Sequence, residues 1–127
     1  MSKDGDKNDR PQDRAVAALV HLELHTRDRA AASSLYRELL GWRAVMVAGS
    51  YLSLDLGGEL GGGIVECGTD RSIWLPYATV GDVIASTERA RRLGAKVLLE
   101  PREGPTGWRS VVVTPAGGEV AMWQAKP

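Results

Sequence analysis

The sequence contains no phenylalanine, a single cysteine and only two histidines among its 127 residues. Because Cys67 stands alone, a disulfide within the chain is excluded, and this cysteine usage is typical of the reducing cytoplasm. Sixteen basic and sixteen acidic side chains cancel, so no overall field favours nucleic acid or an anionic membrane surface as a partner. No apolar run approaches the roughly 20 residues of a membrane-spanning helix, and the polar N-terminus has no signal-peptide core. Composition therefore predicts a soluble, cytoplasmic protein.

The first fifteen residues have almost no apolar side chains. They consist mainly of Lys, Asp, Asn, Gln, Arg and Gly. Such a segment cannot bury enough apolar surface to offset the entropy lost on ordering, so residues 1–15 are predicted to form a disordered polar tail. The remaining residues, 16–127, have the length of one compact domain.

Within that domain the sequence repeats one pattern twice. In residues 19–68, and again in residues 73–125, a short apolar strand leads to an aspartate and then to a helical stretch that ends at a glycine. Three further short strands complete each unit. An internal repeat of this kind indicates the architecture before single motifs are weighed. We predict an α+β fold in which two βαβββ modules form curved mixed sheets around a cleft.

Both predicted helices have capping signals at each end. The first begins at Asp28 and runs to Leu40, with Gly41 as the stop, and the second begins at Asp82 and ends at Gly94. Apolar or small side chains recur at helical spacing along each helix. The stripes predicted to face the sheet are Ala31, Leu35 and Leu39 in the first helix and Val83, Thr87 and Ala90 in the second.

Strand alternation divides the side chains between the two faces of the predicted sheet. The aliphatic set of each strand is predicted to pack beneath the helices, which leaves a polar and aromatic set on the open face. The predicted ligand-binding residues on that face are His21, Glu23, His25, Tyr51, Ser53, Leu75, Tyr77, Trp108, Ser110 and Trp123. Aromatic rings with a few polar groups are typical of a small-molecule cleft.

Glycine-rich segments are predicted to form the turns between strands. These segments are Gly57-Gly58, Gly61-Gly62-Gly63 and Gly117-Gly118. The triplet is not a phosphate-binding loop, because no helix with a suitable Lys-Ser/Thr pair follows it.

Motifs in both modules, taken together, resemble those of one known superfamily. The matching segments are His21-Leu22-Glu23-Leu24, Asp28, Leu35-Tyr36-Arg37-Glu38-Leu39-Leu40-Gly41-Trp42, Trp74-Leu75-Pro76-Tyr77, Val80-Gly81-Asp82-Val83, Leu93-Gly94-Ala95 and Thr114-Pro115-Ala116-Gly117-Gly118. On these segments the chain resembles the vicinal oxygen chelate superfamily of glyoxalase, extradiol dioxygenase and bleomycin-resistance proteins. The resemblance implies the paired-module fold and a homodimer with clefts at or near its interface.

Metal enzymes of that superfamily place a histidine on the first strand of each module and a carboxylate on the last. Carried over to this chain, His21 occupies the first histidine position, whereas the second is Leu75 and the final carboxylate position is Ala121. Glu66 is the candidate for the carboxylate of the first module. With at most two of four ligands present, the resemblance implies a branch without metal or other cofactor, like the bleomycin-resistance proteins.

Two alternatives use the polar residues of the first strand. His21, Glu23 and His25 share one face and could bind a metal directly, but same-face neighbours on a strand lie about 6.5–7 Å apart and converge poorly on one ion. Alternatively, Glu23 and a histidine could perform acid–base chemistry without a metal.

Three hypotheses for function follow from these residues together with the resemblance, and the first is drawn by analogy with the bleomycin-resistance proteins. The leading one is a non-catalytic binding protein that sequesters an aromatic, largely apolar natural product, such as an antitumour antibiotic, and so confers drug resistance. The second is a metal-independent isomerase, cyclase or lyase of secondary metabolism, with Glu23 or His21 as general base. The third is a metal-dependent lyase or dioxygenase. In the first hypothesis, Trp108 and Trp123 stack on a planar aromatic or apolar ligand.

Overall fold

A computed structural model of the protein describes residues 16–49, 51–68 and 72–127. The predicted tail of residues 1–15 lies outside the described residues. The elements in chain order are β1 (Leu19–Thr26), α1 (Arg29–Leu40), β2 (Arg43–Ala48), β3 (Tyr51–Asp55), β4 (Gly61–Glu66), β5 (Ile73–Thr79), α2 (Val83–Arg92), β6 (Lys96–Glu103), β7 (Gly107–Val113) and β8 (Glu119–Ala125). This order is βαβββ followed by βαβββ, as the repeated sequence pattern predicts.

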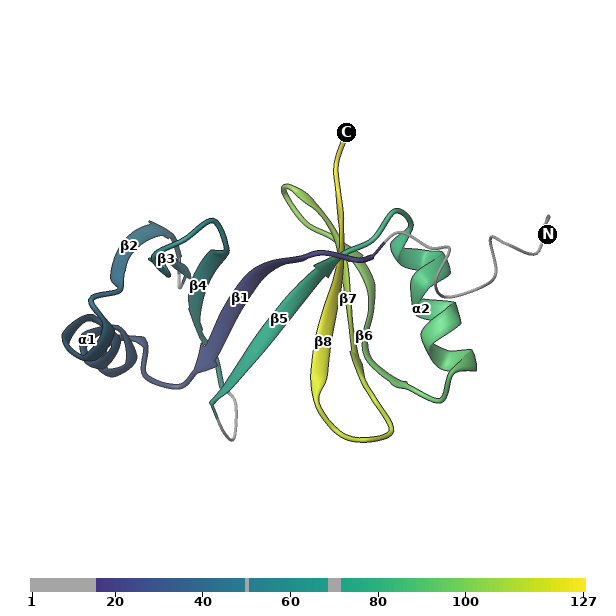
Figure 1. Ribbon diagram of the computed structural model, residues 1–127, viewed down its shortest axis with the longest axis horizontal. Helices are drawn as coiled ribbons and strands as arrows, with labels where there is room; N and C mark the ends of the chain where they lie inside the picture. The colour runs from purple at the N-terminus through teal and green to yellow at the C-terminus, as the bar shows by residue number, and fades with distance from the viewer. Residues whose placement is uncertain (1–15, 50, 69–71) are drawn as a thin grey trace.

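The strands of the described residues form one mixed sheet in the order β2-β3-β4-β1-β5-β8-β7-β6. In each module the first and last strands pair in parallel, β1 with β4 and β5 with β8, and the modules join where β1 pairs antiparallel with β5. Figure 1 shows this junction in the middle of the molecule, with α1 and α2 at opposite ends. The predicted α+β class, with two modules in a curved mixed sheet, is confirmed.

The helix ends follow the predicted capping signals. The Asp28 carboxylate accepts a hydrogen bond from the Ala31 backbone N–H at 3.0 Å, and Asp82 accepts one from Ala85 at the same distance. Gly41 ends α1 with a φ of 74°, in the left-handed region that glycine adopts most readily. Within the described residues, neither helix is long and apolar enough to cross a membrane.

The predicted inner stripe of α1 is wrong by one position. Leu35 is 58% exposed and Leu39 is 67% exposed, whereas Ala32 and Tyr36 pack against the sheet. Both sets have the spacing of a helix face, so periodicity alone could not separate them. The ring of Tyr36 decides the orientation, because it stacks on Trp42 with centroids 5.4 Å apart. In α2 the predicted stripe is confirmed, since Val83 and Thr87 are buried and Ala90 is half-buried.

Among the described residues, two clusters of buried apolar side chains lie on opposite faces of the sheet. The cluster beneath α1 consists of Leu24, Leu52, Leu54 and Ile64, with Tyr36, Trp42 and Trp74 packed against it. The second cluster consists of Leu75, Tyr77, Val111 and Ala121, with Val20, Leu99 and Trp123 at its edge. This second cluster lies on the concave face of the sheet, beneath a cavity that Tyr77 and Trp123 also line.

Candidate functional site

A cavity of 770 Å³ opens on the concave face of the sheet. Its volume falls in the range of about 300–1,000 Å³ that is usual for small-molecule sites. All eight strands contribute to its wall, together with the loop between β6 and β7. Because Val47 of edge strand β2 and Arg102 of edge strand β6 line the same cavity, the sheet must curl until its two edges face each other.

The structure places six of the ten predicted site residues along this cavity. They are His21, Glu23, His25, Tyr51, Tyr77 and Trp123. The other four are Ser53, Leu75, Trp108 and Ser110, and they do not line it. The role of the six in ligand binding stays a prediction.

Glu23 is the centre of a polar cluster at the base of the cavity. Its side chain is buried, and one carboxylate oxygen accepts hydrogen bonds from His25 Nε2 at 2.8 Å and from the Tyr77 hydroxyl at 2.9 Å. His21 Nε2 lies 3.6 Å from the other oxygen. The Tyr77 hydroxyl in turn accepts a hydrogen bond from Arg109 Nη1 at 2.8 Å. Two consecutive hydrogen bonds therefore link the Arg109 guanidinium on β7, through the Tyr77 hydroxyl, to the Glu23 carboxylate on β1.

The surroundings fix the protonation of the groups in this cluster. Burial on its own would raise the pKa of Glu23, but the nearby His21 and the hydrogen bonds from His25 and Tyr77 hold that pKa well below the usual carboxyl range. Burial, and then the charge of Glu23, raise the pKa of the Tyr77 hydroxyl and also that of the Tyr51 hydroxyl. At neutral pH, Glu23 is therefore an acceptor and both tyrosines are donors.

Two glycines of β4 make room for the side chains of the cavity. The Tyr51 ring lies over Gly63, where any side chain would overlap it, and its hydroxyl reaches to 3.2 Å from His21 Nε2. A methyl group on Gly61 would meet His21 Nδ1 at 2.9 Å. The prediction that this glycine triplet forms a turn is wrong, because the triplet is the start of strand β4. Gly61 and Gly63 leave space for side chains of the cavity.

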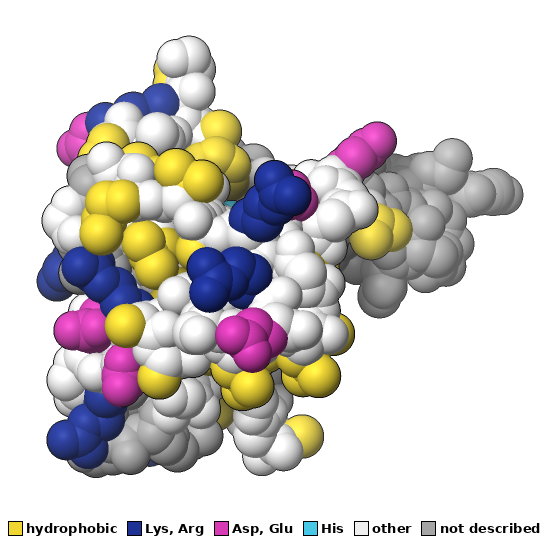
Figure 2. Space-filling model, turned by 90° about the vertical axis from the view of Figure 1, so that its left-hand side faces the viewer, with side chains coloured by type: hydrophobic (Ala, Val, Ile, Leu, Met, Phe, Trp, Pro, Cys, Tyr) yellow, Lys and Arg dark blue, Asp and Glu magenta, His cyan; other side chains and the backbone are white. Residues whose placement is uncertain are grey.

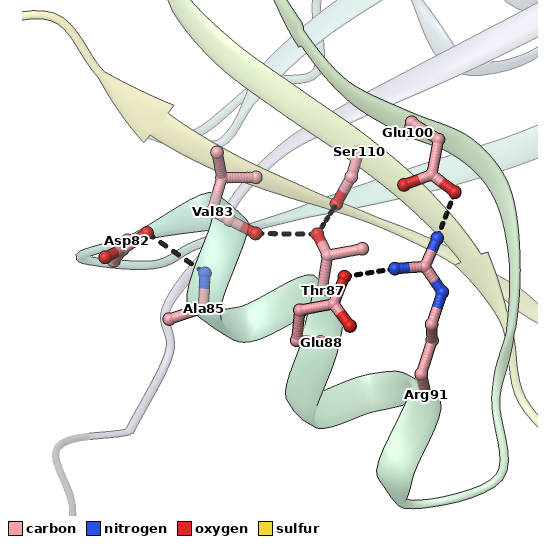
Figure 3. A network of polar contacts seen from close by, with 8 residues as sticks. All are labelled: Asp82, Val83, Ala85, Thr87, Glu88, Arg91, Glu100 and Ser110. Carbon is pink, nitrogen blue, oxygen red and sulfur yellow. Dashed lines mark hydrogen bonds and ion pairs between the residues drawn. The ribbon is translucent and has the colours of Figure 1, made fainter.

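Ser110 and Trp108 lie on the face opposite to the predicted one. Ser110 is fully buried beneath α2, and its hydroxyl lies 2.8 Å from the Thr87 hydroxyl, within hydrogen-bonding distance. The Thr87 hydroxyl donates to the Val83 carbonyl at 2.6 Å. Figure 3 shows Thr87 pointing from α2 onto this strand. Alternation of polarity failed here because Val111 and Val112 are both buried, so β7 has no solvent face that would reveal its orientation.

The buried pair of hydroxyls gives a direct test of this orientation. Thr87→Val is expected to lower the free energy of unfolding by about 1–2 kcal/mol, because it leaves the Ser110 hydroxyl buried without a partner. Urea unfolding of the single variants and of Thr87→Val with Ser110→Ala measures the coupling. The double variant should lose less than the sum of the two single losses. Strictly additive losses would contradict the interaction.

The remaining two predicted residues lie on the correct face but outside the cavity. Leu75 is 1% exposed and forms part of the cluster that underlies the cavity, so other side chains separate it from any ligand. Ser53 shares a face with Tyr51 on β3, but it is exposed and points to solvent beyond the wall.

Arg109 is the main site residue that sequence reasoning missed. It lines the cavity from β7 and pairs across the sheet with Trp123. Val113 and Glu119 pair on either side of the turn between β7 and β8, which fixes the whole register of that hairpin. Because antiparallel partners share a face, counting back from the turn would have placed Arg109 beside Trp123 in the cleft.

Strand register also locates the position equivalent to Ala121 in the first module. His21 stands seven residues before Asp28, as Leu75 stands seven before Asp82. The residues two positions after these, Glu23 and Tyr77, pair in parallel with Gly63 and Ala121 respectively. Gly63 is therefore the counterpart of Ala121, and the assignment of Glu66 to that position is wrong.

Glu66 has a different place at the far end of β4. It is exposed, and its carboxylate accepts a hydrogen bond from the backbone N–H of Arg29 at the start of α1, at 3.0 Å. The four positions that metal enzymes of the resembled superfamily use are thus His21, Gly63, Leu75 and Ala121. Three of these cannot bind a metal, so the residues do not fit such a centre. Among the described residues, no group of three or more His, Cys, Asp or Glu could hold a metal ion.

Comparison with solved structures identifies the fold. A glyoxalase/bleomycin resistance protein/dioxygenase superfamily member from Vibrio splendidus matches with a TM-score of 0.62 at 17% identity, over 87% of this chain and 100% of that one. Methylmalonyl-CoA epimerase from Mycobacterium tuberculosis matches with a TM-score of 0.59 at 16% identity, over 86% and 88% of the two chains. The Mn(II)-bound glyoxalase from Novosphingobium aromaticivorans gives 0.62 at 17% identity, over 86% of this chain.

The likeness extends to architecture and no further. This chain spans 39% of the length of the Novosphingobium glyoxalase. No protein-family model matches the sequence, and no curated protein matches it either. At these identities the comparisons show the fold, which the resembling motifs predict, and they assign no chemistry to the cavity.

Proposed function

We propose that this chain, built on the fold of glyoxalase/bleomycin resistance/dioxygenase superfamily members, is a non-catalytic binding protein for a planar, aromatic and largely apolar small molecule. A natural product such as an antitumour antibiotic fits this description. Held in the cavity, a toxic compound is kept from its target by mass action, and drug resistance follows. The single cysteine suits a cytoplasmic site of action.

The replacement of the metal positions is the observation that supports this proposal. Gly63, Leu75 and Ala121 stand where relatives with a metal need ligands, and the space is filled by the Tyr51 ring and an apolar cluster. What remains is a cavity walled by Tyr51, Tyr77 and Trp123. Aromatic side chains of this kind offer stacking surfaces to flat rings.

The environment of Glu23 makes the alternative, a metal-independent isomerase, cyclase or lyase, the weaker proposal. A general base must accept a proton readily, yet the Glu23 carboxylate already accepts hydrogen bonds from His25 and Tyr77, and its pKa is low. Such a carboxylate is a weak base at neutral pH. In that alternative His21 is the better candidate.

A homodimer is part of the same proposal. The face that carries α1 and β2 has patches of apolar side chains between basic and acidic ones (Figure 2). Exposed apolar side chains on these two elements are Leu35, Leu39, Leu40, Val45, Met46 and Val47. Val47 also lines the cavity, so a second copy on this face would cover the open rim of the site.

Binding without turnover is the testable core of the proposal. Native mass spectrometry of protein purified from its own host should report two chains with one small molecule each, and chromatography should recover that molecule unchanged. Trp123→Ala is expected to weaken binding of the recovered compound about tenfold in calorimetry, because a stacking surface is lost. Trp108→Ala, on the opposite face, is the matched control and should leave affinity unchanged. Recovery of a chemically altered product would contradict the proposal.

A further inference from the structure

We infer that the ligand of this cavity carries a carboxylate or a similar planar anionic group, and that Arg109, with Arg102 beside it, recognises that group. This inference rests on the proposed binding function and adds the chemical class of the ligand. It comes from the charges that the curled sheet brings together, rather than from the aromatic wall.

The first observation is the incomplete pairing of Arg109. Arg109 lines the cavity, and among the described residues its guanidinium forms one hydrogen bond, from Nη1 to the Tyr77 hydroxyl at 2.8 Å. A guanidinium presents five N–H donors in a planar fork. The fork is therefore held in place at one corner, and its other donors remain for a ligand.

The second observation is the neighbour of Arg109 across the sheet. Arg102 of β6 pairs directly with Arg109 of β7, and both line the cavity. Like charges directly opposite each other on antiparallel strands destabilise the pair. An anion between two arginines removes that repulsion, since each fork can donate to its oxygens.

The third observation is that the acidic groups of the cavity wall have other partners. Glu103 forms an ion pair with Lys126 at 2.7 Å. Glu23 is reached from Arg109 only through the Tyr77 hydroxyl, which lies between the two charges and hydrogen-bonds to both. Within the described part of the chain, neither cavity arginine forms an ion pair with a carboxylate.

Register also determines what lies next to the anion. Trp123 is the cross-strand partner of Arg109, and its indole crosses Gly107, where a methyl group would meet Nε1 at 2.8 Å. A ligand whose anionic group sits on Arg109 therefore has its ring system beside Trp123. This arrangement fits an aromatic acid better than a neutral arene, because guanidinium forks bind carboxylates in a bidentate way.

Two probes that differ only in charge test the inference. Calorimetry with 2-naphthoate and with the neutral, nearly isosteric 2-naphthamide should give at least about tenfold tighter binding of the carboxylate to the wild-type protein. Arg109→Met should abolish that preference while changing the affinity for naphthamide little. Arg109→Lys should keep part of it, as a point charge without the fork. Arg92→Met, on the exposed end of α2, is the matched control and should retain the full preference.

The outcomes separate this inference from the function on which it rests. Equal binding of both probes to the wild-type protein overturns the anion site and leaves the binding function standing. Binding of neither probe overturns both. If Arg109→Met does not fold, as judged by circular dichroism, Arg102→Met takes its place and should reduce the preference several-fold. A preference that increasing NaCl concentration does not weaken would also contradict the assignment, because Arg102 is exposed and Arg109 is only half-buried, so salt screens their charges.

Discussion

Glu23→Gln is expected to lower the free energy of unfolding by about 2 kcal/mol at neutral pH and by much less near pH 3. The wild-type carboxylate accepts hydrogen bonds from His25 and Tyr77 in a buried site, and an uncharged amide accepts them more weakly. Chemical denaturation of both proteins across this pH range measures the difference. The expected loss is large because the buried Glu23 carboxylate is surrounded by His21, His25 and the Tyr77 hydroxyl. That hydroxyl in turn accepts a hydrogen bond from Arg109.

The direction of the pH effect follows from the lowered pKa of Glu23. As the pH falls below the ordinary carboxyl value of 4.5, the unfolded chain takes up a proton at this residue before the folded chain does. Proton uptake by the unfolded state favours unfolding, so the stabilisation is present above that pH and is lost on acidification. The wild-type protein should therefore approach the stability of the variant in acid. Glu38→Gln, at an exposed position on α1, is the control. A gap that stays constant from neutral pH to about pH 3 would contradict this account.

Gly63→Ala is expected to destabilise the protein by about 1–3 kcal/mol and to weaken ligand binding, although it adds only one methyl group. The added carbon would overlap the Tyr51 ring, so the ring must leave its position over β4. The contact between its hydroxyl and His21 is then lost, and the displaced ring enters the cavity. Urea unfolding and calorimetry with an aromatic probe measure the two effects.

A matched substitution separates close approach from the general cost of replacing glycine. Gly58 is exposed, has no atom within 4 Å of an added Cβ, and does not adopt a left-handed backbone conformation. Gly58→Ala should therefore leave both stability and affinity close to those of the wild-type protein. If the two variants behaved alike, the space above Gly63 would have no part in shaping the site.

The fold could be predicted because its signals are local and occur twice. Asp28 and Asp82 cap their helices through the same hydrogen bond, and Gly41 ends α1 in the conformation that glycine favours. The face of β1 could also be predicted, since aliphatic and polar residues alternate there, and Glu23 lines the cavity as expected. Each of these features depends on residues close in sequence, which is where patterns are informative.

The wrong or missing predictions concern residues whose place depends on burial of both strand faces or on contact with residues distant in sequence. No residue close to Ser110 in sequence indicates that Thr87, on α2, forms a hydrogen bond with it. The role of Gly63 depends on Tyr51, a residue of another strand. Arg109 was missed because an arginine in a strand usually faces solvent, and only the register of the hairpin brings it beside Trp123.

Trp74 packs one repeat against the other. It belongs to β5, the first strand of the second module, yet its indole packs against Tyr36 and Trp42 of the first and donates a hydrogen bond to the Tyr36 hydroxyl. Neither repeat can loosen without exposing aromatic surface that belongs to the other. The sequence is a tandem copy, but we expect the two copies to unfold together, because Trp74 of the second packs its indole against the first.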